Sequence, residues 1–353
     1  MGTIVHPDIE ISVDAPYPDR ESGDGDTGKG SFTILIPVYD DWRALNLLLR
    51  DVDRVVGEHG LDVDVLIVDD GSPTPMPHAF QRLSWNHIRK LEVLELVRNL
   101  GHQRAICVGL VMLSLAKTGR NVIVMDGDGE DGPGDIIGLI ERFRQLKGAQ
   151  IVFAQRTRRA EGLLFKLFYL CFKLLHILLV GDKVRVGNFS LIPYGTLNRL
   201  VFVSELWNHY AAAVIHSRFP FAMTPIDRRR RLCGKSKMNF ISLVLHGLTA
   251  ISVYADRVGI RLLIITLIVW LACAGGVVAR TTVSAGSPSD SLSISAVLLL
   301  VTLFQTVVIL VMTVFVVLLS RSHTHLVPLR DCPLYVMAQH TVFVSRAAVS
   351  AKC

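Results

Sequence analysis

One short stretch of the sequence concentrates acidic side chains, and their spacing suits metal chemistry. The segment VMDGDGEDGPGD, residues 124–135, directly follows an apolar run. Like charges this close repel each other, so they either point into water on a loop or share a cation. Asp126 and Asp128, followed by Glu130, offer the hard oxygen ligands that Mg²⁺ or Mn²⁺ prefers. A solvated acidic turn is the alternative, because Asp-x-Asp alone is common by chance.

Short apolar runs alternate with helix-like patterns around this stretch. The runs are rich in Val, Ile and Leu, as in strands that are buried on both faces. Apolar residues recur at helical spacing between them, at residues 42–56, 105–117 and 135–146. This alternation predicts an α/β fold whose sheet is mostly parallel, with helices on both faces. The predicted strands are residues 32–38, 63–72, 91–97, 121–126 and 149–156.

Polar residues gather where these predicted strands end. In parallel sheets, ligands bind at the carboxyl ends of the strands. A second carboxylate pair, Asp69 and Asp70, strengthens the case for a cation at this edge of the sheet. Together with the polar segment 37–40, the two acidic loops predict a pocket for a nucleotide diphosphate.

Composition and charge pattern point to a membrane. Half of the 353 residues are hydrophobic and the mean hydropathy is +0.42. Residues 262–279 and 291–320 carry no charge, and a spanning helix needs about 20 residues, so we expect two transmembrane helices. Arginines flank the pair on its outer sides, whereas the loop between holds only Arg280 and Asp290. The positive-inside rule therefore predicts an integral protein of the inner (plasma) membrane, with both termini and the catalytic domain cytoplasmic.

Two further apolar segments, residues 163–179 and 238–254, carry lysines or follow basic residues. We interpret them as amphipathic helices in the membrane interface, and a buried core helix is the alternative for the first. The basic run 228–231 is attributed to anionic lipid headgroups. The net charge of +6 would also suit nucleic acid, but basic residues beside apolar helices favour a membrane, so no nucleic-acid partner is expected.

These patterns divide the chain into five parts. Residues 1–31 are predicted to be a disordered acidic tail without a signal peptide. The catalytic domain is assigned to 32–230, a juxtamembrane segment to 231–257, the two transmembrane helices to 258–320 and a cytosolic tail to 321–353. The six scattered cysteines suggest neither zinc nor a disulfide framework.

Four motifs in order, IPVYDD, VDDGS, RNLGHQRA and VMDGDGED, resemble those of family 2 glycosyltransferases with the GT-A fold. The later segment RLCGKSKMNFISLVLHG, followed by two apolar runs, is similar to the dolichyl- and polyprenyl-phosphate sugar synthases. The resemblance covers residues 32–320.

The resemblance implies roles by position. Asp126 and Asp128 would serve catalysis and, with Glu130, hold a divalent cation, Mg²⁺ or Mn²⁺; Glu130 stands where the family has a neutral ligand. Arg156 matches a family arginine and would also be catalytic. The nucleotide-sugar site would comprise Pro37, Tyr39, Asp40, Asp69, Asp70, Gly71, Ser72, Asn99 and Gly101. The acceptor phosphate would contact Arg156, Arg158, Arg159, Lys235, Ser236 and Lys237. The segment 187–190 departs from the family pattern, which leaves acceptor contacts there open.

The implied reaction transfers a sugar, with inversion, from a nucleotide-diphosphate sugar to a polyprenyl phosphate of the undecaprenyl type. A phosphate monoester is already anionic at neutral pH, so no general base is required. The expected partners are this donor, this acceptor and the lipid bilayer, and the oligomeric state is left open. Alternatives are another membrane or glycan acceptor, or a non-catalytic protein that binds nucleotide sugar or lipid. A processive polysaccharide synthase would carry Gln-x-x-Arg-Trp, which is absent. His102, His209 and His246 are given no role.

Overall fold

The computed structural model describes residues 30–78, 80, 85–156, 181, 186–226, 229, 231–233, 249–283, 298–299, 301–310, 312, 316 and 326–345. The predicted acidic tail and the interfacial segment 163–179 lie outside these residues.

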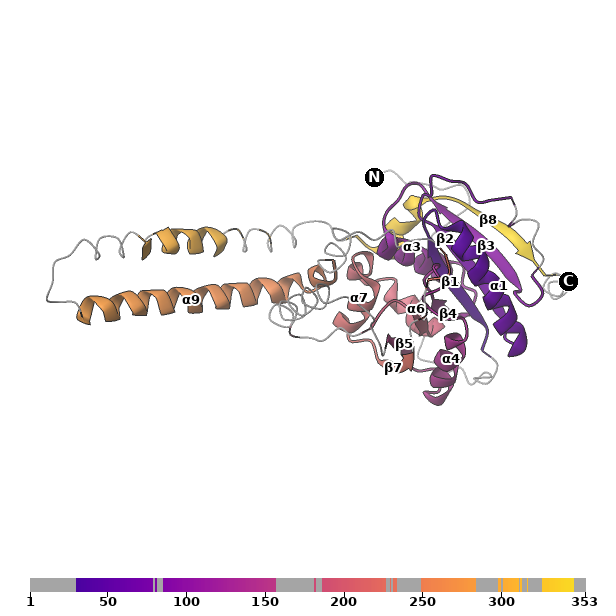
Figure 1. Cartoon of the computed structure of the whole chain (residues 1–353), viewed down its shortest axis with the longest axis horizontal. Helices are drawn as coiled ribbons and strands as arrows, with labels where there is room; N and C mark the ends of the chain where they lie inside the picture. The colour runs from indigo at the N-terminus through magenta and orange to yellow at the C-terminus, as the bar shows by residue number, and fades with distance from the viewer. Residues whose placement is uncertain are drawn as a thin grey trace, which may run out of the picture.

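Within the described residues, eight strands form one sheet in the order β7-β5-β6-β4-β1-β2-β3-β8 (Figure 1). The four central strands β4, β1, β2 and β3 are mutually parallel, whereas β6 and β8 run antiparallel to their neighbours. The fold is therefore α/β, and its sheet is mixed but mostly parallel. The strands are β1 (Phe32–Val38), β2 (Val63–Asp69), β3 (Lys90–Leu96), β4 (Asn121–Val124), β5 (Ile151–Arg156), β6 (Ser190–Ile192), β7 (Phe221–Ile226) and β8 (Val336–Val344).

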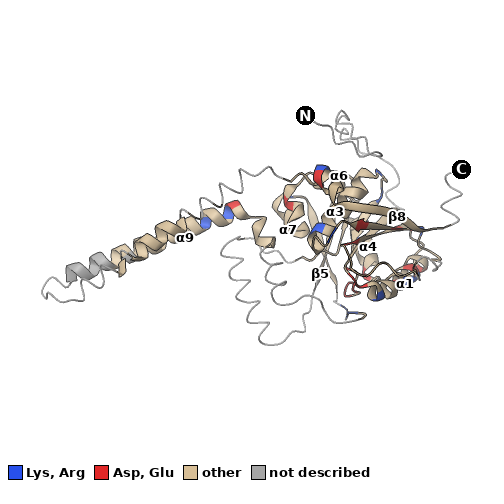
Figure 2. Ribbon diagram, turned by 90° about the horizontal axis from the view of Figure 1, so that it is seen from above, with Lys and Arg blue, Asp and Glu red and all other residues tan. Residues whose placement is uncertain are grey.

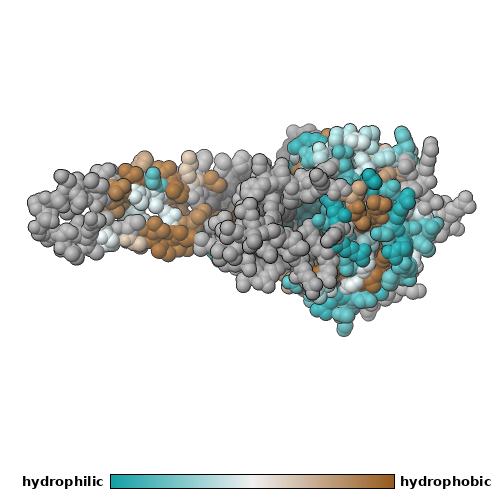
Figure 3. Space-filling model, in the orientation of Figure 1, coloured by the Kyte–Doolittle hydropathy of each residue, from teal (hydrophilic) through white to brown (hydrophobic). Residues whose placement is uncertain are grey.

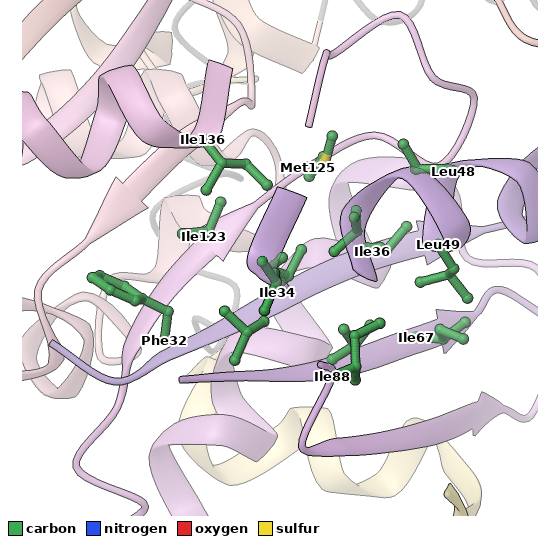
Figure 4. Packing of buried hydrophobic residues seen from close by; sticks show 14 of the residues in the cluster. Phe32, Ile34, Ile36, Leu48, Leu49, Ile67, Ile88, Ile123, Met125 and Ile136 are labelled. Carbon is green, nitrogen blue, oxygen red and sulfur yellow. The ribbon is translucent and has the colours of Figure 1, made fainter. Parts of the chain in front are cut away.

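Helices cover both faces of the sheet, as the continuous apolar runs predict. On one face, α1 (Trp42–Glu58) and α4 (Asp135–Gln145) enclose Ile34, Ile36 and Ile67, which Figure 4 shows beside Leu48 and Leu49. On the other face, α3 (His102–Leu115), α6 (Tyr194–Leu200), the 3₁₀ turn η1 (Ser204–Trp207) and α7 (Tyr210–His216) form the second core. Burial on both faces explains why β1 is apolar throughout.

The C-terminal part of the chain returns to the sheet. After α11 (Pro328–Asp331) and the 3₁₀ turn η2 (Cys332–Tyr335), β8 pairs antiparallel with β3 at the sheet edge. The sequence analysis treats residues 321–353 only as a tail, so this strand is a difference. Its burial alternates along the strand, as in an edge strand with one covered face, and its partner lies far away in sequence.

One long helix projects from the domain. α9 (Ala255–Val283) includes the predicted span 262–279, and its part Ala255–Gly276 is apolar and long enough to cross a membrane. Asp256, Arg257 and Arg261 lie at its domain end (Figure 2), and many of the coloured side chains along the helix beyond them are apolar (Figure 3). Most of the predicted second span lies outside the described residues. Its longest described part is the shorter apolar helix Val301–Leu310. The described residues thus contain one candidate span rather than two.

Candidate active site

Three loops meet at the carboxyl ends of the parallel strands. The loop after β1 turns at Asp40, whose φ of 48° lies in the left-handed region, and its backbone N–H donates to Ser72 Oγ at 2.7 Å. Ser72 N–H in turn donates to Asp69 Oδ1 at 3.0 Å. Burial raises the pKa of Asp69, although the Ser72 hydrogen bonds oppose this. The predicted residues Asp40, Asp69 and Ser72 are thus brought together, with Tyr39 half exposed beside them.

Asp70 and Gly71 organise the neighbouring loop. Both Asp70 carboxylate oxygens accept backbone N–H groups, from Leu100 at 2.7 Å and Gly101 at 2.9 Å. Burial raises the pKa of Asp70 to about 6. Gly71 has a φ of 67° and lies so close to the backbone of Arg98 that a Cβ would collide with it. These two residues therefore hold the 98–101 loop, and their place in the nucleotide-sugar site stays a prediction.

The acidic loop is faced by an arginine and a histidine. Asp126 Oδ1 lies 3.1 Å from His102 Nε2, and Asp128 Oδ2 lies 3.2 Å from Arg231 Nη1. Arg231 also pairs with Asp41, so it joins two loops. Burial raises the pKa of Asp128, and Arg231 and the Glu130 N–H, which donates to Asp128 Oδ1 at 3.0 Å, oppose the rise. Desolvation lowers the pKa of His102, but Asp126 and further carboxylates outweigh it and raise that pKa overall.

A segment that precedes α9 in the chain packs on this loop. Arg229 N–H donates to Glu130 O and Leu232 N–H to Asp128 O, both at 3.1 Å. The Leu232 side chain covers Gly129 so closely that a Cβ there would collide with it. Arg229, Arg231 and Leu232 therefore all contact the acidic loop. The sequence analysis attributes this basic run to lipid headgroups, but Arg231 contacts carboxylates of the site.

A chain of polar side chains supports His102 from behind. Asn188 Nδ2 lies 3.0 Å from His102 Nε2, the same nitrogen that faces Asp126, so this nitrogen either donates to Asp126 or accepts from Asn188. Gln103 Nε2 donates to Asn188 Oδ1 at 3.0 Å. Gln103 Oε1 also accepts the backbone N–H of Tyr210 at 2.8 Å. This network ties the start of α3 to the start of α7 and places the Asn188 amide beside the imidazole of His102.

The predicted metal ligands are only partly assembled. Among the residues that the structure describes, no group of three or more His, Cys, Asp or Glu side chains is placed to hold a metal ion. Glu130 therefore does not complete such a group. Asp126 and Asp128 still fit a divalent cation chemically, because Mg²⁺ commonly binds one or two carboxylates together with substrate phosphates.

Comparison with known proteins identifies the domain. Residues 33–194 match the model of Glycosyl transferase family 2. These residues are a family 2 glycosyltransferase domain. The uncharacterized glycosyltransferase YkcC of Bacillus subtilis is 25% identical over 232 residues, which cover 63% of this chain and 68% of that protein. The undecaprenyl-phosphate 4-deoxy-4-formamido-L-arabinose transferase of Erwinia tasmaniensis is 30% identical over 130 residues, 37% of this chain and 38% of that protein.

Two further similarities are broader in extent. The transferase of the same description from Klebsiella pneumoniae is 27% identical over 225 residues, which are 60% of this chain and 64% of that protein. Among solved structures, glucosyl-3-phosphoglycerate synthase of Mycobacterium tuberculosis gives a TM-score of 0.46 at 15% identity, covering 65% of this chain and 80% of that one. The family model and the glycosyltransferase relatives identify the chain as a glycosyltransferase.

Several predicted residues of this glycosyltransferase lie outside the structure's description. These are Arg158, Arg159, Lys235, Ser236, Lys237 and the side chain of Arg156. The backbone of Arg156 ends β5 and pairs with Ile226 of β7. Pro37 lies in β1, and Asn99 and Gly101 lie in the loop that Asp70 holds. The predicted acceptor residues thus lie mostly outside the described residues, whereas the predicted donor residues lie within them, and both assignments stay predictions.

Three side chains at the candidate site have no role assigned from the sequence: Asp41, His102 and Arg231. His102 and Asp41 stand inside motifs quoted for the family resemblance, but nothing in their spacing shows that they face carboxylates. Arg231 follows Asp128 by about a hundred residues, so only the fold reveals the pair. For Arg231, the one signal in the sequence is its place shortly before Lys235 and Lys237, which are predicted to bind the acceptor phosphate.

Proposed function

We propose that this glycosyltransferase moves a sugar from a nucleotide-diphosphate sugar to a polyprenyl phosphate of the undecaprenyl type, with inversion, at the cytoplasmic face of the plasma membrane. The observation that carries the proposal is the acidic loop at the carboxyl edge of the sheet, faced by Arg231 and His102. Two relatives named as undecaprenyl-phosphate sugar transferases support the acceptor. The apolar helix α9 supports a membrane location.

On the donor side, the turn of Asp40, Asp69 and Ser72 would receive the nucleoside. Asp126 and Asp128 would hold a divalent cation, which when bound stabilises the departing diphosphate as a Lewis acid. The protein's own contribution is to keep these carboxylates close together although they repel. The pairing of Asp128 with Arg231 and of Asp126 with His102 supplies the compensating charge before any ligand arrives.

Arg231 would change partners when the donor binds. A planar guanidinium pairs with phosphate as well as with carboxylate. A diphosphate next to Asp128 would therefore draw Arg231 away from Asp128, while Asp41 keeps it in place through its own ion pair. Charge balance at the loop would be preserved in both states.

On the acceptor side, an anionic phosphate must approach the anomeric carbon opposite the leaving group. Positive charge is required to hold it there. Arg156 at the end of β5 and the predicted group Arg158, Arg159, Lys235, Ser236 and Lys237 would supply it.

The test is transfer of radiolabelled sugar from a panel of UDP- and GDP-sugars to polyprenyl phosphate, in detergent with Mg²⁺ or Mn²⁺. We expect label in the organic phase, and loss of that label with EDTA or in Asp128→Ala. Asp51→Ala on the exposed surface of α1 is the matched control and should stay active. Transfer only to an acceptor that is not a lipid phosphate would contradict the proposed acceptor, and transfer without any metal would contradict the cation.

A further inference from the structure

Both ends of the apolar segment dock on one side of the catalytic domain. Before α9, Ile251, Val253 and Tyr254 pack against Ala212 of α7. After the segment, Leu329 N–H of α11 donates to the Val201 carbonyl at 3.2 Å, directly after α6. Because the chain leaves and returns beside α6 and α7, this side of the domain must face whatever surrounds α9.

Large apolar side chains are exposed on the same side. Phe202 is 57% exposed at the end of α6, Leu334 is 63% exposed in η2, and Met337 is 63% exposed at the start of β8. Val97, 49% exposed, adjoins them, since its N–H donates to the Tyr335 carbonyl at 3.0 Å. Single exposed apolar residues are ordinary, but a group on neighbouring turns marks an interaction surface. We call Val97, Phe202, Leu334 and Met337 the apolar patch.

Aromatic and cationic side chains border the apolar patch. The rings of Trp207 and Tyr335 lie 5.0 Å apart, and the Arg104 guanidinium stands 5.2 Å from the centre of the Trp207 ring. The Arg330 side chain is 66% exposed on α11. Aromatic rings and arginines beside apolar residues are typical of surfaces that lie in the headgroup region of a bilayer.

We propose that the apolar patch rests in the headgroup region of an anionic bilayer. The bilayer is the favoured occupant because the patch is continuous with the docking sites of the membrane-directed segment, and because the Trp207 and Tyr335 rings and the Arg104 guanidinium border it. This contact would hold the carboxyl edge of the sheet at the depth of a lipid phosphate. The inference depends on the proposed membrane location, but not on the identity of the sugar or the acceptor.

The test measures the depth of single positions in the bilayer. Phe202→Cys and Leu334→Cys are made in the full-length chain, with native cysteines other than the buried pair Cys107 and Cys332 replaced by serine. Each is labelled with a polarity-sensitive fluorophore and reconstituted into vesicles of phosphatidylethanolamine and phosphatidylglycerol. Leu47→Cys, on α1 over the opposite face of the sheet and 42% exposed, is the matched control.

We expect blue-shifted emission at positions 202 and 334, quenched by lipids brominated on the acyl chain, and neither effect at position 47. Quenching equal to that of position 47 would overturn the proposal. A blue shift that persists in detergent and grows with protein concentration would overturn the proposal in favour of contact with a second copy of the chain. Sugar transfer is assayed on the same samples. Quenching without transfer to polyprenyl phosphate would support the membrane contact of the apolar patch and contradict the proposed acceptor. Transfer without quenching would support the proposed acceptor and contradict the membrane contact.

Discussion

Arg231 holds carboxylates of two different loops, Asp41 and Asp128, and it occupies the position where positive charge is needed in the absence of a cation. Metal and guanidinium therefore compete for Asp128. Removing Arg231 should make the metal bind more tightly while the reaction itself becomes slower.

For Arg231→Ala we expect about fivefold tighter apparent binding of Mg²⁺ or Mn²⁺, equivalent to ~1 kcal/mol for a partly exposed ion pair. We expect kcat to fall roughly ten- to a hundredfold, because a charge-assisted contact to the leaving group is lost. Titration of transfer rate against metal concentration measures both. Arg54→Ala, in an exposed pair on α1, should change neither. Weaker metal binding in Arg231→Ala would contradict the competition.

Asp70 makes stability depend on pH. Its pKa is raised from 3.8 to about 6, so between these values the folded state holds a proton that the unfolded state has lost. The free energy of unfolding should therefore fall as pH rises from about 4 to 6, by up to about 3 kcal/mol. Thermal unfolding across this range measures the slope. Asp70→Asn should remove this part of the slope, whereas Asp51→Asn on the surface should keep it.

At the scale of elements, the polar network joins α3 to α7 through one side chain, Gln103. In Gln103→Leu the Tyr210 N–H and the Asn188 amide lose their buried partners, at a cost of ~1–3 kcal/mol each. We expect lower thermal stability and a fall in kcat that exceeds any change in KM for the donor, since Asn188 is no longer held in place beside His102.

Gln103→Glu separates the two effects. It keeps the acceptor for Tyr210 but cannot donate to Asn188, so stability should largely return while kcat stays low. Gln145→Leu, at the exposed end of α4, is the matched control. A kcat that follows stability in both Gln103 variants would show that the network is only structural.

β8 depends on alternate backbone hydrogen bonds to β3. Ala338 lies opposite Glu95 and Gln339 opposite Leu94, so only one of the two N–H groups points toward β3. Of Ala338→Pro and Gln339→Pro, one should destabilise the domain by ~3 kcal/mol and the other far less, because proline is tolerated on the open side of an edge strand. Chemical denaturation measures both, and equal effects would contradict the register.

The sequence predicts the strands that carry a local apolar run of several residues and misses the others. β1 to β5 correspond to the predicted apolar runs, and β1 and β2 are buried along their whole length. β6 is only three residues long, β7 contains Pro225 and is half exposed, and β8 finds its partner more than two hundred residues away. None of these carries a local signal.

The residues of the candidate site also divide into those that the sequence predicts and those that only the fold reveals. The loops of Asp40, Asp69 and Asp126 were predicted because strand ends meet at one edge of a parallel sheet. Asp70 was assigned to the nucleotide sugar, but its carboxylate is used by the backbone of residues 100 and 101. His102 and Arg231 depend on distances between segments far apart in the chain, which no motif contains.

At the scale of the whole molecule, the position of β8 changes how the chain should be divided. The strand that closes the sheet comes after α9, so the apolar segment is an insertion within the catalytic domain and not an appendage at its end (Figure 1). Ending the chain before α9 would remove β8 and expose the β3 edge to other strands. A water-soluble enzyme should therefore come from excising residues 255–325 and bridging the gap with a flexible linker, whereas simple truncation should give aggregates.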